Sequence, residues 1–240
     1  ADREDHLHAA TGVATLREGE SLTWAVSTEA NPNLVGDRAW SQRHNHEQAR
    51  LDCWRPHHAN APEWVQQLVL AADQFIVQRR IDGEPAGKSV IAGYPWFGDW
   101  GRDTMIALPG LTLATGRPEI AGSILRTFAP HVNQGMLPNR FPDGADSPDY
   151  NTVDATLWYF QAIRAYHDTT KDDGLLRELY PVLAEIIAWH RQGTRYQIHA
   201  DAEDGLLYAG NAEVQLTWMD AKVDDWVVTP RTGKPVEVNA

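Results

Sequence analysis

The stretch from Gly93 to Leu111 constrains the fold more than any other part of the chain. Before Thr104 it contains three glycines, two tryptophans, two aspartates and an arginine. Glycine lets the backbone turn sharply or come close to a ligand. The apolar residues after it have helical spacing, and Asp103 or Thr104 is a suitable helix N-cap. The stretch therefore predicts a rigid, aromatic-lined turn that presents Arg102 and Asp103 together at a helix start.

An arginine-aspartate pair beside indole rings allows two interpretations. Indole covers the apolar C–H face of a pyranose, and charged groups hydrogen-bond its hydroxyls, so the pair suits a sugar site. The same residues also suit a buried structural ion pair under a tryptophan-rich core, because perturbed ion pairs are often structural. The residues alone leave both interpretations open.

Charge and composition exclude some classes of partner. The net charge is −12, and no basic stripe exists to neutralise phosphates, so we expect no nucleic-acid partner. A neutral carbohydrate is compatible with this charge, and ten tryptophans suit either a sugar site or a large helical core. We find no membrane-span pattern and no signal-peptide pattern. Cys53 is the only cysteine, which allows a reducing compartment, and we expect a cytoplasmic protein.

The first sixty residues differ in pattern from the rest. Within residues 1–30, two β-prone runs flank a polar turn, which predicts a short hairpin. A hairpin alone is marginally stable, so we expect the end of an N-terminal β-rich domain or an arm packed on the next part of the chain. Residues 31–60 are polar and rich in Asn, Pro and His, which predicts a linker. Because the chain neither begins with Met nor ends on a terminating signal, we expect a fragment at both ends.

Residues 61–240 read as helical. Asn60-Ala-Pro-Glu63 resembles a capping box before an apolar face that runs to Ile76. A loop is expected over 82–92. Further helices are expected over 103–114, 118–130, 152–168 and 174–192, with Pro109 kinking or ending the first of them. Short connections between helices of similar length predict antiparallel helical hairpins in an all-α fold.

Three loops, at 93–103, 137–154 and 215–237, combine Arg with Asp, and the first and third also contain Trp. Loops of one composition on a helical scaffold are expected to face one site. Asp103 and Asp154 also stand where helix caps are expected, and for each alone capping is an equal explanation. The histidine-dense segments at 44–46 and 57–58 lack the carboxylates and helix context of a catalytic metal site, so we expect no metal and no other cofactor.

Five ordered motifs in and around these loops resemble the glucosidase domain of glycogen debranching enzyme (amylo-α-1,6-glucosidase). They are Gly-Tyr-Pro-Trp-Phe-Gly-Asp-Trp-Gly-Arg-Asp-Thr, Leu-Pro-Asn-Arg-Phe, Asn-Thr-Val-Asp-Ala-Thr-Leu-Trp, Leu-Thr-Trp-Met-Asp-Ala and Thr-Pro-Arg-Thr-Gly-Lys-Pro-Val-Glu-Val-Asn-Ala. The resemblance covers about residue 90 to the C-terminus. It implies an (α/α)6 toroid, with about its first half in residues 61–240, preceded by a β-rich domain. Glucoamylases look like more distant relatives.

The resemblance implies an inverting glycoside hydrolase that releases glucose from α-1,6 branch stubs of a glycogen-type limit dextrin, a branched α-glucan. It implies that Asp220 is the general acid, and Trp218 and Met219 flank it as an apolar wall of the kind that such an acid needs. The expected substrate contacts are Trp100, Arg102, Asp103, Asp154, Trp158, Trp218, Arg140 and Glu237.

Inverting hydrolysis also needs a second carboxylate, about 6.5–9.5 Å from the acid, to activate water. In the enzymes that the chain resembles, this base lies near the end of the toroid. We therefore expect the base, and the remainder of the barrel, to come from residues outside this chain. Two alternatives stay open: another α-toroid glucosidase of the trehalase or oligosaccharide-processing type, and a non-catalytic sugar-binding fragment.

Overall fold

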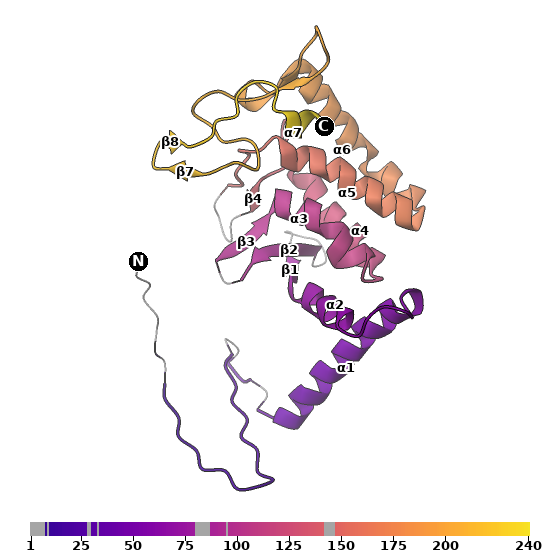
Figure 1. Cartoon of the computed structure of the whole chain (residues 1–240), viewed down its shortest axis with the longest axis vertical. Helices are drawn as coiled ribbons and strands as arrows, with labels where there is room; N and C mark the ends of the chain where they lie inside the picture. Colours follow the sequence, from indigo (N-terminus) through magenta and orange to yellow (C-terminus); the bar gives the residue numbers. More distant parts are fainter. Residues whose placement is uncertain are drawn as a thin grey trace. The chain divides into compact units, whose positions relative to one another are not determined.

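A computed structural model gives the structure of most of the chain (Figure 1). It describes residues 8, 10–27, 30–32, 34–79, 87–94, 96–141 and 147–240. The chain divides into two compact units, Ala1–Ala49 and Arg50–Ala240.

The first unit has the expected turn but not the expected strands. Glu20 N–H donates to Arg17 O (3.0 Å), and Gly19 has a φ of +85°. No described residue between 8 and 32 belongs to a strand, and Val13 and Val26 are 95% and 90% exposed. A hairpin needs an apolar face packed on something else to be stable, and these side chains have no such cover within their unit.

The stretch expected to be a linker is mostly helix α1 (Gly36–Trp54). Its middle is polar on all sides and carries an Arg43–Glu47 pair at helical spacing (2.6 Å). Only Leu51 and Trp54, in its last turn, are buried, where they pack with Val69 of α2. A helix that buries so few residues shows no apolar stripe in its sequence, so hydrophobic periodicity could not predict it.

Helix α2 (Val65–Gln74) is shorter than expected. Its N-cap is Trp64 and no side chain caps it, so the Asn60–Glu63 capping box is not formed. The helix ends at Phe75, and the next residues form strand β1 (Ile76–Arg79). The prediction of a helical face that continues to Ile76 was wrong, because a β-branched pair begins a strand there.

A four-stranded antiparallel sheet, in the order β1-β2-β3-β4, corrects the all-α expectation. The other strands are β2 (Gly87–Gly93), β3 (Phe97–Trp100) and β4 (Arg140–Phe141). Ile76 pairs with Val90, and Asp99 pairs with both Ile91 and Phe141. Residues 87–92, expected to be loop, are therefore strand, whereas 82–86 lie outside the described residues.

Helix α3 (Gly101–Leu108) comes directly after β3 and continues into a π-helical turn at Pro109–Leu113. Ala114 N–H donates to Pro109 O (2.9 Å), a bond five residues back. This widened turn is the distortion expected from Pro109, which has no N–H to donate. Gly116, with a φ of +74°, ends the element as predicted, and α4 (Pro118–Phe128) starts at its proline.

Helices α5 (Asp154–Thr170) and α6 (Asp173–Gln192) match their predicted ranges closely and contact each other. Only Lys171 and Asp172 separate them. Lys171 has a φ of +55°, and the Asp172 side chain accepts from Gly174 N–H and Leu175 N–H. This is a helical hairpin of the predicted kind, with an N-cap at its second helix.

The main core lies where α3, α4, α5 and α6 meet β2 (Figure 1). Tyr159 is fully buried there and donates to Leu125 O (2.8 Å), and burial raises the pKa of its hydroxyl. The largest wholly buried side chains include Leu108, Ile124, Leu125, Phe128, Leu175, Leu179 and Ile186. The helices therefore form one packed helical region, of which α3 and α5 start at the candidate site.

Residues 193–240 are mostly loop, with two short hairpins, β5–β6 (His199–Ala200 and Leu207–Tyr208) and β7–β8 (Lys222–Val223 and Trp226–Val227), and helix α7 (Val236–Asn239). A second core cluster joins this segment to the rest. Its buried members are Met136, Val153, Ile198, Ala209, Leu216 and Val238. Through it, the loops 137–154 and 215–237 pack against each other.

Candidate active site

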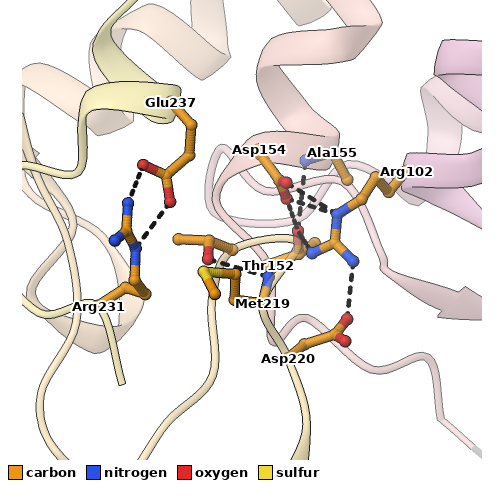
Figure 2. Close-up of polar contacts among 9 residues, drawn as sticks. Arg102, Thr152, Asp154, Ala155, Met219, Asp220, Arg231 and Glu237 are labelled. Atoms are coloured by element: carbon orange, nitrogen blue, oxygen red, sulfur yellow. Dashed lines mark hydrogen bonds and ion pairs between the residues drawn. The ribbon is translucent and has the colours of Figure 1, made fainter. Parts of the chain in front are cut away.

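The side chain of Arg102 connects three segments of the second unit (Figure 2). From the first turn of α3, its Nε donates to both carboxylate oxygens of Asp154 (3.0 and 2.8 Å). Its Nη2 donates to Thr152 Oγ1 (3.2 Å), and its Nη1 donates to Asp220 Oδ2 (2.8 Å). Arg102 is only 8% exposed. One guanidinium therefore holds the start of α3, the start of α5 and the loop that carries Asp220.

Asp154 is the buried anchor of this cluster and is 6% exposed. It is the first residue of α5, whose N-cap is Val153, so the capping interpretation of Asp154 was wrong. Thr152 Oγ1 donates to Asp154 Oδ1 (2.6 Å) and accepts from Ala155 N–H (3.3 Å). Both oxygens of Asp154 thus have donors, as a buried carboxylate requires.

Electrostatics favour a permanently charged Arg102. Burial acts to lower the pKa of Arg102, but the hydrogen bonds and charges of Asp154 and Asp220 outweigh it, and the pKa is raised. Two carboxylates share one guanidinium, so the three groups carry a net charge of about −1 when all are ionised. Asp220 is the partner nearer to solvent, with its side chain 35% exposed.

Asp103 does not pair with Arg102, which corrects the predicted adjacent pair. Consecutive residues of a helix point about 100° apart, so their side chains do not face each other. No described side chain donates a hydrogen bond to the Asp103 carboxylate. Partial shielding from water raises its pKa, as do the nearby charges of Asp220 and Asp154, while a hydrogen bond from its own backbone N–H and the charge of Arg102 act in the opposite direction. Trp100, in an extended conformation, is the N-cap of α3, so neither Asp103 nor Thr104 caps it.

A pocket of about 500 Å³ lies beside this cluster. This volume is within the usual range for small-molecule sites. Five of its lining residues are among the expected site residues: Trp100, Arg102, Asp103, Trp218 and Asp220. The others are Ala92, Phe97, Asn139, Asn151 and Gln215. Each of the three loops, 93–103, 137–154 and 215–237, therefore contributes residues to one pocket.

Four expected residues do not line this pocket, and one of them, Asp154, is the buried partner of Arg102 described above. Trp158 lies one turn after Asp154 on α5 and is 40% exposed. Arg140, on β4, pairs with Asp149 (2.7 Å), and both side chains are about half exposed. Glu237, on α7, binds Arg231 through both carboxylate oxygens, and this contact lowers the pKa of Glu237. In Figure 2 the Glu237–Arg231 pair stands apart from the Arg102 cluster.

Sequence reasoning missed four polar residues of this region: Thr152, Asn139, Asn151 and Gln215. Asn139 and Asn151 are inside the motifs that pointed to the site, but asparagine is common in any loop and so carried no signal by itself. Thr152 stands two residues before Asp154, a position that fits an ordinary threonine near a helix start. Only its contacts with Arg102 and Asp154 distinguish it.

Backbone contacts hold the pocket loops together. Gly101 N–H donates to Asn139 O (2.7 Å), and a Cβ at Gly101 would lie 2.1 Å from Pro138 O, so only glycine fits there. Asn139 N–H donates to Asp149 O (2.7 Å). Val153 N–H donates to Leu216 O (2.8 Å) and ties the start of α5 to the Trp218 loop. The side chains are therefore presented from a braced framework.

In the part of the chain that the structure describes, no three His, Cys, Asp or Glu side chains gather as a metal site would require. Nor does any described helix combine the length and apolar character needed to cross a membrane.

The geometry suits a neutral polyhydroxylated ring. Trp100 and Trp218 offer indole surfaces, and Asp103 and Asp220 offer carboxylates that accept hydrogen bonds. Arg102 donates to only one oxygen of Asp220, Oδ2, while Oδ1 receives no hydrogen bond from a described residue. One carboxyl oxygen is thus positioned and the other is available to a ligand.

Comparison with known proteins agrees with this chemistry. A family model described as Amylo-alpha-1,6-glucosidase matches residues 70–240, more than two thirds of the chain. The glycogen debranching enzyme of Saccharomyces cerevisiae is 25% identical over an alignment of 238 residues. The alignment covers 73% of this chain. The match covers 15% of the length of that relative. The resemblance drawn from the five sequence motifs is confirmed.

Proposed function

Since this chain belongs to the amylo-alpha-1,6-glucosidase family, we propose that its pocket takes part in hydrolysing the terminal glucose of an α-1,6 branch stub on a branched α-glucan such as limit dextrin. The observation that carries the proposal is the Arg102–Asp220 contact at the wall of a pocket that also contains Trp100 and Trp218. It supplies one oriented carboxyl group and two surfaces on which a pyranose can stack.

Asp220 is the proposed general acid. Arg102 Nη1 holds Oδ2, which leaves Oδ1 as the position for the proton. In the proposed reaction that proton moves to the glycosidic oxygen as the bond from this oxygen to C1 breaks. Water adds to C1 from the opposite face and loses its own proton to a second carboxylate, so the products are glucose of inverted configuration and a shortened glucan.

The second carboxylate is proposed to lie outside this chain. Asp154 does not line the pocket and is bound by Arg102, and Asp99 is paired with Arg79 (2.7 Å). Asp103 lines the pocket and is proposed to bind a sugar hydroxyl, beside Trp100, Trp218 and Arg102 itself. Asp154 supports the site through Arg102. Trp158, Arg140 and Glu237 are proposed to contact the substrate only when a larger site is assembled.

The domain organisation is part of the same proposal. Residues 61–240 are the proposed first half of an (α/α)6 toroid, and the pairing of α5 with α6 supports it. Residues 1–30 are the proposed end of a β-rich domain, and 31–60 the proposed connection, now with α1 in it. The exposed apolar side chains of residues 10–27 are compatible with cover from such a domain. A cytoplasmic location is proposed on the basis of a glycogen-type substrate.

The test is to assay this chain, and the protein at its natural length, on α-1,6-branched limit dextrin, maltose and trehalose. We expect the natural-length protein to release glucose from the dextrin as the β-anomer, observed by NMR before mutarotation, and the 240-residue chain to be nearly inactive. Preference for trehalose or maltose would indicate another α-toroid glucosidase. Sugar binding without hydrolysis by the natural-length protein would indicate a non-catalytic module.

A further inference from the structure

Two residues on the wall of the pocket each have a buried side-chain amide oxygen without a hydrogen-bond partner. Among the described residues, six buried side-chain N or O atoms lack a partner, and Asn139 Oδ1 and Asn151 Oδ1 are the two whose residues line this pocket. Asn139 is 1% exposed. Neither asparagine side chain makes a hydrogen bond to another described residue, so neither side chain holds a loop in place.

Backbone hydrogen bonds hold Asn139, and Asn151 adjoins a residue of the Arg102–Asp154 cluster. Asn139 is bonded on both sides, through its N–H to Asp149 O and through its carbonyl to Gly101 N–H, each at 2.7 Å. Asn151 directly precedes Thr152, whose hydroxyl is part of the Arg102–Asp154 cluster. The backbone of Asn139 is therefore fixed beside the pocket, and that of Asn151 lies next to the Arg102–Asp154 cluster.

A buried acceptor without a donor destabilises the empty protein, because it has lost water and gained nothing in return. A ligand hydroxyl would supply the missing donor. The amides are neutral, so they add acceptors without adding charge to a pocket that already contains Asp103 and Asp220. Sugar hydroxyls both donate and accept, and the carbonyl oxygen of asparagine is a suitable acceptor for them.

We infer that Asn139 and Asn151 are specificity-determining residues, each accepting a hydrogen bond from a different hydroxyl of the glucosyl unit in the pocket. The inference rests on the proposed function of this pocket as a glucosyl site. It identifies the ligand class further: the pocket selects a pyranose in which both of these hydroxyls are free, and it rejects analogues in which either is removed. Loss of one such contact typically weakens binding by about 10- to 100-fold.

The first experiment needs no substitution. Binding of D-glucose and of its 2-, 3-, 4- and 6-deoxy analogues to the natural-length protein is measured by NMR titration. We expect at least two deoxy analogues to bind about 10- to 100-fold more weakly than glucose. If all four bind as well as glucose, the inference is wrong.

The second experiment assigns the contacts. Asn139→Leu and Asn151→Leu replace each amide by an apolar group of similar size. Each variant should bind glucose about 10- to 100-fold more weakly and lose its discrimination against one deoxy analogue, a different one for each variant. Because neither side chain bonds to the protein, the melting temperature should not fall. Unchanged analogue ratios in folded variants would overturn the inference, and Asn139→Ala and Asn151→Ala provide the same comparison if leucine prevents folding.

Ser89→Ala is the matched control. Ser89 Oγ is also buried and without a partner, but Ser89 does not line the pocket, so its loss should change no sugar ratio. Glucose release from limit dextrin is measured on the wild-type protein in parallel. If the wild-type protein releases glucose but neither asparagine variant changes the analogue binding ratios, only this inference is rejected. If the wild-type protein neither binds glucose nor releases it from limit dextrin, the proposed function is wrong, and the inference is wrong with it.

Discussion

Arg102 Nη1 donates a 2.8 Å hydrogen bond to Asp220 Oδ2 across 118 positions of sequence. On its other edge the same guanidinium holds both oxygens of the buried Asp154. Arg102, which orients the proposed acid Asp220, is therefore also the counter-ion of the buried Asp154 carboxylate. We therefore expect stability and the proposed activity to be coupled at Arg102, and substitutions at its partners should separate the two.

Arg102→Ala should lower both stability and turnover. It leaves Asp154 buried without its cation, and breaking a buried pair in this way typically costs about 3–5 kcal/mol. Urea denaturation measures the first effect, and kcat/KM on limit dextrin, measured on folded protein, measures the second. Loss of stability with an unchanged kcat/KM would mean that the pair is only structural.

Arg117→Ala is the matched control for that variant. Arg117 is 1% exposed and binds Asp73, Thr115 Oγ1 (3.0 Å) and Leu111 O (2.9 Å), and it does not line the pocket. Its removal should also cost about 3–5 kcal/mol, while kcat/KM of the folded enzyme stays within about twofold. Equal losses of kcat/KM in both variants would show that general destabilisation explains the Arg102 result.

Asp103→Asn should lower activity without lowering stability. No described side chain bonds to this carboxylate, whereas a sugar hydroxyl bound to a charged group contributes about 1.5–3 kcal/mol, so kcat/KM should fall about 10- to 150-fold. Asp168→Asn, on the exposed face of α5, is the control and should leave both quantities unchanged. Wild-type kinetics in Asp103→Asn would remove this residue from the site.

The pH dependence of stability should also change in Asp103→Asn. The folded pKa of Asp103 is raised above its ordinary value of 3.8, so between these two pKa values the folded state binds more protons than the unfolded state. Its ionisation therefore removes stability as the pH rises from 3.8 through the folded pKa. The Asn variant lacks this loss. The unfolding midpoint of the variant minus that of wild type should therefore increase as the pH rises through that window. A relative decrease would contradict the direction of the shift.

Asp220→Asn should separate a proton donor from a residue that only positions the ring. The amide keeps the size and shape of the side chain but has no acidic proton. Hydrolysis of limit dextrin should fall by ~10²–10⁴-fold or more, because its leaving group depends on protonation. Glucosyl fluoride needs little such help, so the variant should lose far less activity on it. Equal losses on both substrates, or none on either, would show that Asp220 is not the acid.

Gly101→Ala should disrupt the junction between β3 and α3. Its Cβ would meet Pro138 O at 2.1 Å, and backbone on both sides leaves no flexible group to move, so we expect a loss of about 1–3 kcal/mol or more. Gly98→Ala, three residues earlier, is the control, because its Cβ would have no atom within 4 Å. Thermal denaturation compares the two, and equal melting temperatures would contradict the close contact.

The elements that the sequence predicted well are those with a long period or a strong boundary signal. Helices α5 and α6 span 17 and 20 residues, enough turns for the apolar spacing to be unambiguous. Pro118 marked the start of α4 because proline suits the first turn of a helix. Strands β3 and β4 have four and two residues, too few to show an alternation, and α1 has no apolar face to detect.

The sequence by itself determined the family, the residue types of the site and three loops that carry them, because these are properties of local order along the chain. Only the tertiary structure decided the partners. Arg102 and Asp103 are neighbours in the chain but diverge on the helix, so Asp154 and Asp220 receive the guanidinium instead. Asn139 and Asn151 became site residues only when packing buried their amide oxygens beside the pocket. Local patterns specify which groups are present, but burial and long-range contact depend on how distant segments pack, and no single segment encodes that.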